Sequence, residues 1–417
     1  ADCAEPILSN IAGTVQTEEA EGVEGAEVLL SGVSSDEEVT IASGNYIFDV
    51  VQNGFDYTVT PHLDENPLNG VTTFDLVLIT KHILGIQILD SPYKMIAADV
   101  NSSGTITTAD MIQLRKLILG IYTDFPNNTS WRFVDADYVF PDATNPWYEE
   151  FPESRNINNL SEDMMSEDFI AAKIGDVNGS ATPNVTVIEE RNVNGLFTLQ
   201  TEDLRLEAGE QYTVHFTAAD LDEIQGYQFT MNFDRTALSF AGMEYGVAQA
   251  ENFGLTYVEE GMITSSWNAA NGQTLKGDEI LFSLVFTAQL EANLSEVISI
   301  GSRITIAEAY NVTNELLDVA MSFNTEASVA GAFEVYQNTP NPFAAETNIG
   351  YNLPEDAAVT ITIQDITGRT IQVMHQDGMK GYNVVTLDAK TLGAAGTMYY
   401  TVATDKYVAT KKMILVK

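Results

Sequence analysis

Oxygen-bearing side chains recur at regular spacing in residues 99–110. Counted from Asp99, oxygens fall at loop positions 1, 3, 5, 9 and 12, and Gly104 stands at position 6. Calcium takes six to eight hard oxygen ligands from one tightly wound loop, with a glycine at the sharp turn. The spacing therefore predicts a Ca²⁺ site, with an Asx-rich turn that caps a helix as the alternative. The candidate ligands are Asp99, Asn101, Ser103, Thr105, Thr107 and Asp110.

A degraded copy of this loop stands earlier in the chain. Its candidate ligands are Asp64, Asn66, Thr72 and Asp75. Position 5 is Leu68 and the glycine has moved to Gly70, so this copy either binds calcium with altered geometry or does not bind it.

A third fragment, residues 176–180, begins like such a loop. It has no acid at the twelfth place. We interpret it as a turn.

Each of the first two loops leads into a predicted helix. Residues 71–86 recur as residues 106–121, with apolar side chains at three- and four-residue spacing. A threonine caps each start, and Gly85 or Gly120 supplies the left-handed stop. The duplication, the Asp110 terminal ligand and the Leu-Gly helix ends resemble a dockerin module. The resemblance covers residues 63–182 and implies a calcium-stabilised helix pair.

An aromatic, acidic insert follows the second helix, and ordinary dockerins lack it. It could form a sugar-stacking patch, but a small satellite core over the helices is the preferred interpretation. Its aromatic residues are Trp131, Phe133, Tyr138, Phe140, Trp147 and Tyr148.

Residues 1–62 are predicted to form short strands separated by turns. Apolar alternation appears in residues 26–30, 46–50 and 55–60, and Asn53-Gly54 indicates a hairpin. The segment resembles the transthyretin-like, carboxypeptidase-regulatory β-sandwich, which implies a structural spacer.

Residues 190–327 alternate at period two in residues 212–216, 227–233 and 280–286. Gly226-Tyr227, Ser266-Trp267 and Gly277-Asp278 stand in an order that resembles a cohesin. Cohesins and dockerins are complementary partners, which implies protein–protein assembly.

Residues 331–417 include Asn338-Thr339-Pro340-Asn341-Pro342-Phe343, Gly368-Arg369 and a closing strand that ends at Lys417. They resemble the type IX secretion C-terminal sorting domain of Bacteroidota. The resemblance implies export to the cell surface or beyond. The fold class is therefore mainly β: three antiparallel β-sandwiches and one small calcium-binding helical module.

Composition limits the partners. Sixty Asp and Glu stand against 19 Lys and Arg, a net charge of −41. Such a surface repels nucleic acid at each phosphate, so nucleic acid is excluded as a partner. No apolar run is long enough for a transmembrane segment. The single cysteine, Cys3, allows no intrachain disulfide. The start at Ala1 fits a mature chain whose signal peptide has been removed.

Catalysis is not expected. The four histidines, His62, His82, His215 and His375, lie in separate segments, and common catalytic motifs are lacking. The preferred function is a secreted structural subunit that associates head to tail, or by strand addition at residues 4–9 and 412–417, into a homo-oligomer or filament. The alternative is a cell-surface adhesin or scaffold that binds glycan or another protein.

Overall fold

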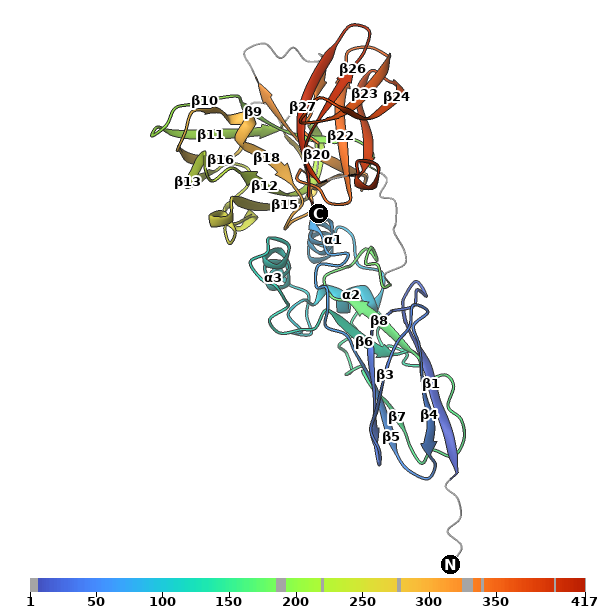
Figure 1. Cartoon of the computed structure of the whole chain (residues 1–417). Helices are drawn as coiled ribbons and strands as arrows, with labels where there is room; N and C mark the ends of the chain where they lie inside the picture. Colours follow the sequence, from blue (N-terminus) through green and yellow to red (C-terminus); the bar gives the residue numbers. More distant parts are fainter. Residues whose placement is uncertain are drawn as a thin grey trace, which may run out of the picture. The chain divides into compact units, whose positions relative to one another are not determined.

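The computed structural model describes residues 7–184, 193–218, 221–275, 279–324, 333–338, 341–393 and 395–416. Cys3 and Gly277-Asp278 lie outside the described residues. The chain is mainly β, with 47% strand and 11% helix. It divides into an N-terminal unit, residues 1–118 and 122–191, and a C-terminal unit, residues 119–121 and 192–417 (Figure 1).

The N-terminal unit contains a sandwich of two four-stranded sheets, ordered β4-β1-β8-β6 and β3-β2-β5-β7. Alternate residues of these strands point into one core, as period-two apolar patterns require. The strands are β1 (Leu8–Thr17), β2 (Glu27–Gly32), β3 (Asp36–Val39), β4 (Asn45–Gln52), β5 (Tyr57–His62), β6 (Trp131–Asp135), β7 (Arg155–Ile157) and β8 (Phe169–Lys173).

The predicted boundary at residue 62 is wrong, because the sandwich needs strands from the aromatic insert. Strand β8 pairs in parallel with β1, β6 pairs with β8, and β7 pairs with β5. Trp131 and Phe133 are buried in the sandwich core. Tyr138, Phe140 and Trp147 pack instead against the helices, as the satellite-core interpretation predicts. The insert thus belongs to both parts of the unit.

Three helices make up the rest of the unit: α1 (Thr73–Ile83), α2 (Pro92–Ala98) and α3 (Thr108–Ile118). The two predicted helices, α1 and α3, share a core that includes Leu76, Ile79, Leu114 and Leu117. Gly85 and Gly120, just beyond their ends, both have φ of 67°. The left-handed stops are therefore confirmed. Helix α2 was not predicted.

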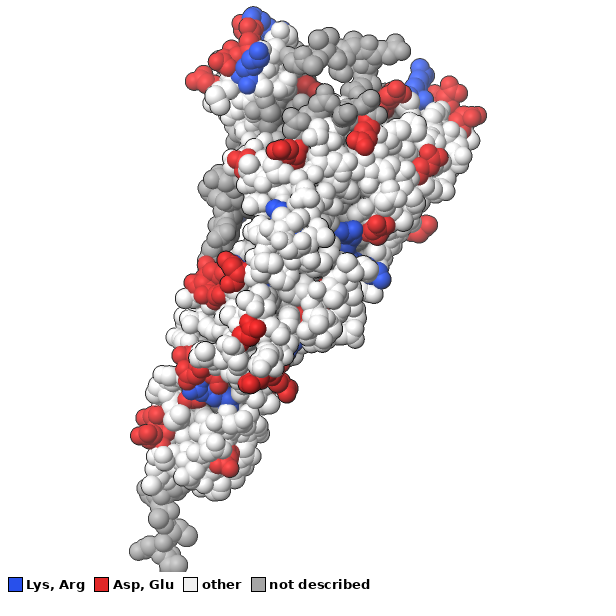
Figure 2. Space-filling model, turned by 180° about the vertical axis from the view of Figure 1, so that it is seen from behind, with Lys and Arg blue, Asp and Glu red and all other residues white. Residues whose placement is uncertain are grey.

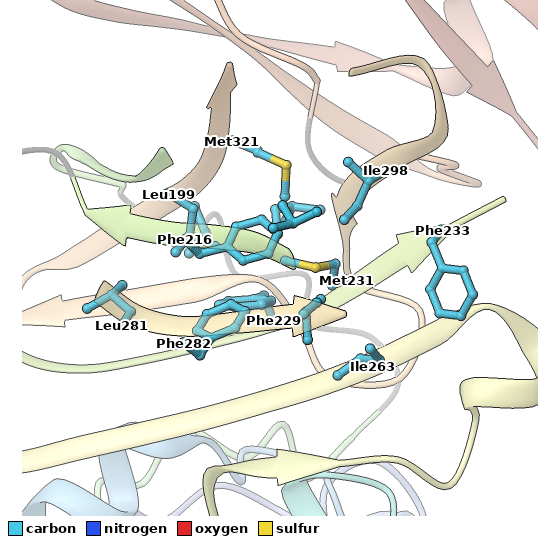
Figure 3. Packing of buried hydrophobic residues seen from close by; sticks show 14 of the residues in the cluster. Leu199, Phe216, Phe229, Met231, Phe233, Ile263, Leu281, Phe282, Ile298 and Met321 are labelled. Carbon is cyan, nitrogen blue, oxygen red and sulfur yellow. The ribbon is translucent and has the colours of Figure 1, made fainter. Parts of the chain in front are cut away.

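The first part of the C-terminal unit is a ten-stranded sheet ordered β13-β16-β11-β9-β20-β19-β12-β15-β14, with β18 paired to β12. Phe216 and Phe282, on the neighbouring strands β11 and β16, share one core with Phe229 and Ile263, on β12 and β15 far along the same order (Figure 3). The sheet therefore closes into a sandwich around that core, and the predicted strands at residues 212–216, 227–233 and 280–286 are confirmed.

A pair of short strands, β10 and β17, completes this part. Its elements are β9 (Leu196–Glu202), β10 (Arg205–Leu206), β11 (Gln211–Ala218), β12 (Leu221–Phe233), β13 (Leu238–Tyr245), β14 (Phe253–Gly254), β15 (Met262–Leu275), β16 (Ile280–Ala288), β17 (Ala292–Asn293), α4 (Leu294–Val297), β18 (Ile298–Gly301), β19 (Glu308–Asn311) and β20 (Leu316–Asn324).

The last part has a three-stranded sheet, β21-β22-β25, and a four-stranded sheet, β24-β23-β26-β27. Tyr351, Ile361 and Tyr400 are buried in its core. The strands are β21 (Glu334–Val335), β22 (Glu346–Leu353), β23 (Ala357–Asp365), β24 (Thr370–Gly378), β25 (Gly381–Asp388), β26 (Gly396–Ala403) and β27 (Val408–Leu415).

Both segments predicted to add strands are already partly paired within the chain. Strand β27 ends the order of its sheet and pairs with β26, and its other side is already partly occupied, because Leu415 forms a parallel bridge with Phe343 and the N–H of Ile414 donates to Asn341 Oδ1. At the N-terminal site, Leu8 and Ser9 already pair with Gln52 and Val51 of β4. Residues 4–6 lie outside the described residues.

Candidate metal centre

The loop between α2 and α3 gathers the predicted calcium ligands. Asp99 ends α2, and its carboxylate accepts hydrogen bonds from the backbone N–H of Ser103 at 2.8 Å (Oδ1) and of Gly104 at 2.7 Å (Oδ2). Gly104 has φ of 78°, a left-handed conformation that glycine adopts without strain. Ser103 Oγ lies 3.1 Å from Thr105 Oγ1 and donates to the Thr105 carbonyl. These hydrogen bonds close the turn around the Asp99 carboxylate.

Asp110 closes the loop from the first turn of α3. Its Oδ2 accepts from the N–H of Thr107 at 2.8 Å, and its Oδ1 accepts from the N–H of Asn101 at 3.1 Å. Because Thr107 Oγ1 in turn accepts from Ala109 N, the same residues cap the helix. The structure brings all six predicted residues, Asp99 to Asp110, into one loop.

The charge and polarity of this loop fit a hard cation. Asp99 and Asp110 are both buried, and burial, together with the charge of Asp110, raises the pKa of Asp99. Within the described chain, the buried Asn101 Oδ1 has no hydrogen-bond donor. A buried acceptor without a donor and two buried like charges are both stabilised by a cation that accepts oxygen ligands.

A cation in this loop would take most of its ligands from oxygen atoms other than carboxylates. The described residues contain no group of three or more His, Cys, Asp or Glu side chains that could hold a metal. The loop instead offers two carboxylates with amide, hydroxyl and carbonyl oxygens, which is a donor set typical of calcium.

The predicted first loop is not a copy of this arrangement, so its ligand set is wrong as a contiguous loop. Asp64 Oδ1 accepts from the N–H and hydroxyl of Ser130, at 2.8 and 3.0 Å. Asp75 Oδ1 accepts from the N–H of Val177 at 2.9 Å. Asn66 adopts a left-handed turn with φ of 49°. The two carboxylates therefore bind different segments. Thr72 and Asp75 do share the capping box of α1.

Sequence reasoning missed two buried charged residues near Asp75. Asp176, interpreted as part of a turn, is 6% exposed, and Lys173 is 5% exposed. Lys173 Nζ donates to the carbonyls of Pro67 and Ile174, and burial lowers its pKa to about 7. The repeated Asp-Val-Asn motif is the signal that could have singled out Asp176.

Three of the four histidines have side-chain hydrogen-bond partners. His82 Nδ1 accepts from the N–H of Leu89 at 3.0 Å. His215 Nδ1 lies 2.8 Å from Ser283 Oγ, its cross-strand neighbour, and His375 Nδ1 lies 3.0 Å from Thr360 Oγ1.

Apolar side chains are exposed on the helical part of the N-terminal unit. Leu84, at the end of α1, is 60% exposed and Ile112 of α3 is 55% exposed, with Ile86 and Ile88 similar. Acidic side chains outnumber basic ones over the face shown in Figure 2. No helix in the described part of the chain is both long and apolar enough to cross a membrane.

Two family models match the C-terminal unit. The cohesin domain model matches residues 198–325, and the secretion system C-terminal sorting domain model matches residues 335–417. These matches confirm the cohesin and sorting-domain predictions. A cohesin domain is a non-catalytic binding module, and the type IX sorting domain indicates export to the cell surface or extracellular space. No curated protein matches the chain.

Several solved structures that resemble the chain at low identity contain cohesins. One is a type I cohesin–dockerin complex from Clostridium thermocellum: identity 12%, coverage 32% of this chain and 94% of that chain, TM-score 0.26. Another is a cohesin of Acetivibrio cellulolyticus scaffoldin B in complex with a dockerin: identity 16%, coverage 31% of this chain and 95% of that chain, TM-score 0.25. A third is a non-cellulosomal cohesin from Archaeoglobus fulgidus: identity 17%, coverage 30% of this chain and 86% of that chain, TM-score 0.21. At these TM-scores the matches carry no conclusion about the chain.

Proposed function

We propose that this chain is a non-catalytic extracellular structural protein that calcium stabilises and that associates head to tail. The helix pair α1–α3 of one copy would bind the cohesin domain of the next. If the rotation between copies does not close a ring, the chain propagates as a surface filament or matrix. Export by the sorting domain would deliver the subunit to the place of assembly.

The observation that supports this proposal most strongly is that one chain contains both a protein-binding module and a helix pair with exposed apolar side chains. A cohesin domain is a protein-binding module. The helix pair carries exposed apolar side chains, Leu84 and Ile112, close to a loop that fits calcium. Exposed apolar residues around a rigid scaffold are typical of protein-binding surfaces.

Calcium would act by holding the start of α3 in place. The loop's two buried carboxylates repel each other, and a cation between them would order the loop and fix α3. Asp99, Asn101, Ser103, Thr107 and Asp110, with the Thr105 carbonyl, would supply the ligands.

The proposal is tested by light scattering of the full chain at increasing concentration. Wild-type chain in calcium should give masses above that of one chain, and Ile112→Asp should give single chains, because a charge in an apolar interface is costly to desolvate. Val139→Asp is the matched control, since Val139 is 83% exposed in the same unit and should not affect mass. A wild-type chain that stays single at all concentrations would contradict self-association and favour the adhesin or scaffold.

A further inference from the structure

Two separated segments of the N-terminal unit repeat the two halves of the Asp99–Asp110 loop. Residues 176–180, Asp-Val-Asn-Gly-Ser, match residues 99–103, Asp-Val-Asn-Ser-Ser. Residues 71–75, Val-Thr-Thr-Phe-Asp, match residues 106–110, Ile-Thr-Thr-Ala-Asp. In the separated copy the order along the chain is reversed: residues 71–75, which match the second half of the loop, precede residues 176–180, which match the first half.

The first halves share two hydrogen bonds, although Asp176 Oδ1 also accepts from the N–H groups of Asn178 and Gly179. Asp176 Oδ1 accepts from the N–H of Ser180 at 3.2 Å, and its Oδ2 accepts from the N–H of Ala181 at 2.6 Å. Asp99 accepts with the same two oxygens from Ser103 and Gly104, also four and five residues further on. The left-handed residue recurs too, at Gly179 with φ of 73° and Ser102 with φ of 55°.

The second halves also match. Asp75 Oδ2 accepts from the N–H of Thr72 at 2.8 Å, as Asp110 Oδ2 does from Thr107. The remaining oxygen of each carboxylate accepts from the other half of its loop. Asp75 Oδ1 binds Val177 N, and Asp110 Oδ1 binds Asn101 N, one position further along.

The hydrogen bond that crosses the break is conserved between the copies. Ser103 Oγ donates to the Thr105 carbonyl at 3.2 Å, and Ser180 Oγ donates to the Gly70 carbonyl at 2.9 Å. Gly70 therefore takes the place of Thr105, at loop position 7, whose carbonyl is a ligand in calcium loops.

The two chain ends at the break lie against each other. A Cβ on Gly70 would stand 2.4 Å from Ala181 N, which leaves room for glycine alone. Asn69 and Thr182 exchange two hydrogen bonds, at 2.8 and 3.0 Å, between side-chain amide and backbone. Contacts thus replace the peptide bond that joins residues 104 and 105 in the contiguous copy.

Buried charge gives a separate reason to expect a cation here. Asp75 is fully buried and Asp176 is 6% exposed. The nearby Lys173 amine donates its two described hydrogen bonds to carbonyls rather than to these carboxylates. Two adjacent buried carboxylates without a directly bonded cation are costly, and a divalent cation removes that cost.

We propose that the N-terminal unit contains a second calcium site, a split loop whose ligands come from both ends of the helical segment. Its ligands are Asp176, Asn178, Ser180, the Gly70 carbonyl, Thr72 and Asp75. The ion would bridge the segment after β8 to the start of α1 and so fasten the end of the module to its beginning. Asp64 and Asn66 take no part.

Calorimetric titration of the full chain with CaCl₂ tests this site. Ile112→Asp serves as the background in all samples, which keeps the count independent of self-association. The chain should bind two ions, and Asp176→Asn and Asp110→Asn should each bind one. Glu150→Gln, a change at an exposed carboxylate of the same unit, should bind two.

A gentler variant guards against misfolding of Asp176→Asn. Asn178 is exposed, and Asn178→Ala should weaken one of the two sites by ~10-fold or more while circular dichroism stays unchanged. A single ion that Asp110→Asn abolishes and Asp176→Asn retains would overturn the split site and leave the proposed assembly intact. No bound ion at all would overturn both calcium sites. Two ions in Asp176→Asn would also overturn the split site.

Discussion

The contiguous loop, residues 99–110, and the split loop, residues 70–75 with 176–181, present the same donors in different ways. In the first, covalent continuity keeps the ligands close together even when no ion is bound. In the second, the halves meet only because strand β8 brings residue 176 back to α1. Bringing distant segments together costs loop-closure entropy, so the split loop depends more on its ion and its contacts. One donor set can thus either order a local turn or join distant parts of a module.

Calcium removal should have the largest effect and should act on one unit. A ligand at a thousand times its Kd adds ~4 kcal/mol of stability, which is on the order of 10 °C for a unit of this size. Scanning calorimetry with calcium and then with EGTA should show that the N-terminal transition falls by that amount. In the Ile112→Asp variant, whose copies should not associate, the C-terminal transition should not move. Equal shifts of both transitions, or none, would contradict the placement of both sites in the N-terminal unit.

Loss of the terminal ligand should be more damaging in the split loop. Asp75→Ala removes bonds to Thr72 and to Val177, and so unties two segments, at a cost of ~3 kcal/mol in calcium. Asp110→Ala unties residues that remain in one loop and should cost less. Urea unfolding of the N-terminal unit measures both.

The two variants control for each other in helix propensity, because each replaces an aspartate by alanine in the first turn of a helix. A difference in cost therefore comes from the lost contacts. A cost for Asp110→Ala equal to or above that for Asp75→Ala would show that the two loops do not differ in their dependence on tertiary contact.

The smallest effect should come from the glycine at the break. Gly70→Ala places a Cβ against Ala181 at a left-handed φ of 74°, whereas Gly85→Ala meets nothing within 4 Å at φ of 67°. Both substitutions should cost ~1–2 kcal/mol of backbone strain, and Gly70→Ala should cost more than that because its Cβ also meets the Ala181 backbone. Gly70→Ala alone should also lower calcium affinity, at one of the two sites. Calorimetric titration of the two variants with calcium measures this. Equal calcium affinities would contradict the proposal that the contact between Gly70 and Ala181 holds the split loop together.

Local patterns in the sequence predicted local structure well. The helix repeat, the left-handed Gly85 and Gly120, and the cohesin strands all follow from short-range periodicity and turn chemistry. The cohesin and sorting domains were also recognisable from residue order.

Long-range pairing was not predictable in the same way. Strand β8 shows the same apolar pattern whether it pairs with β1 or with another strand, so its partnership with Val15–Thr17 leaves no local signal. The aromatic insert was therefore assigned only to the helices. Asp176 was interpreted as a turn for the same reason, since its twelfth-position acid, Asp75, lies a hundred residues before it in the chain.

Electron microscopy of the negatively stained chain, first in calcium and then after chelation, tests the proposed function most directly. We predict regular fibres in calcium that loosen or dissolve on chelation, because both calcium sites hold the helices that the next copy would bind. Dispersed single particles under both conditions would contradict a calcium-dependent structural polymer.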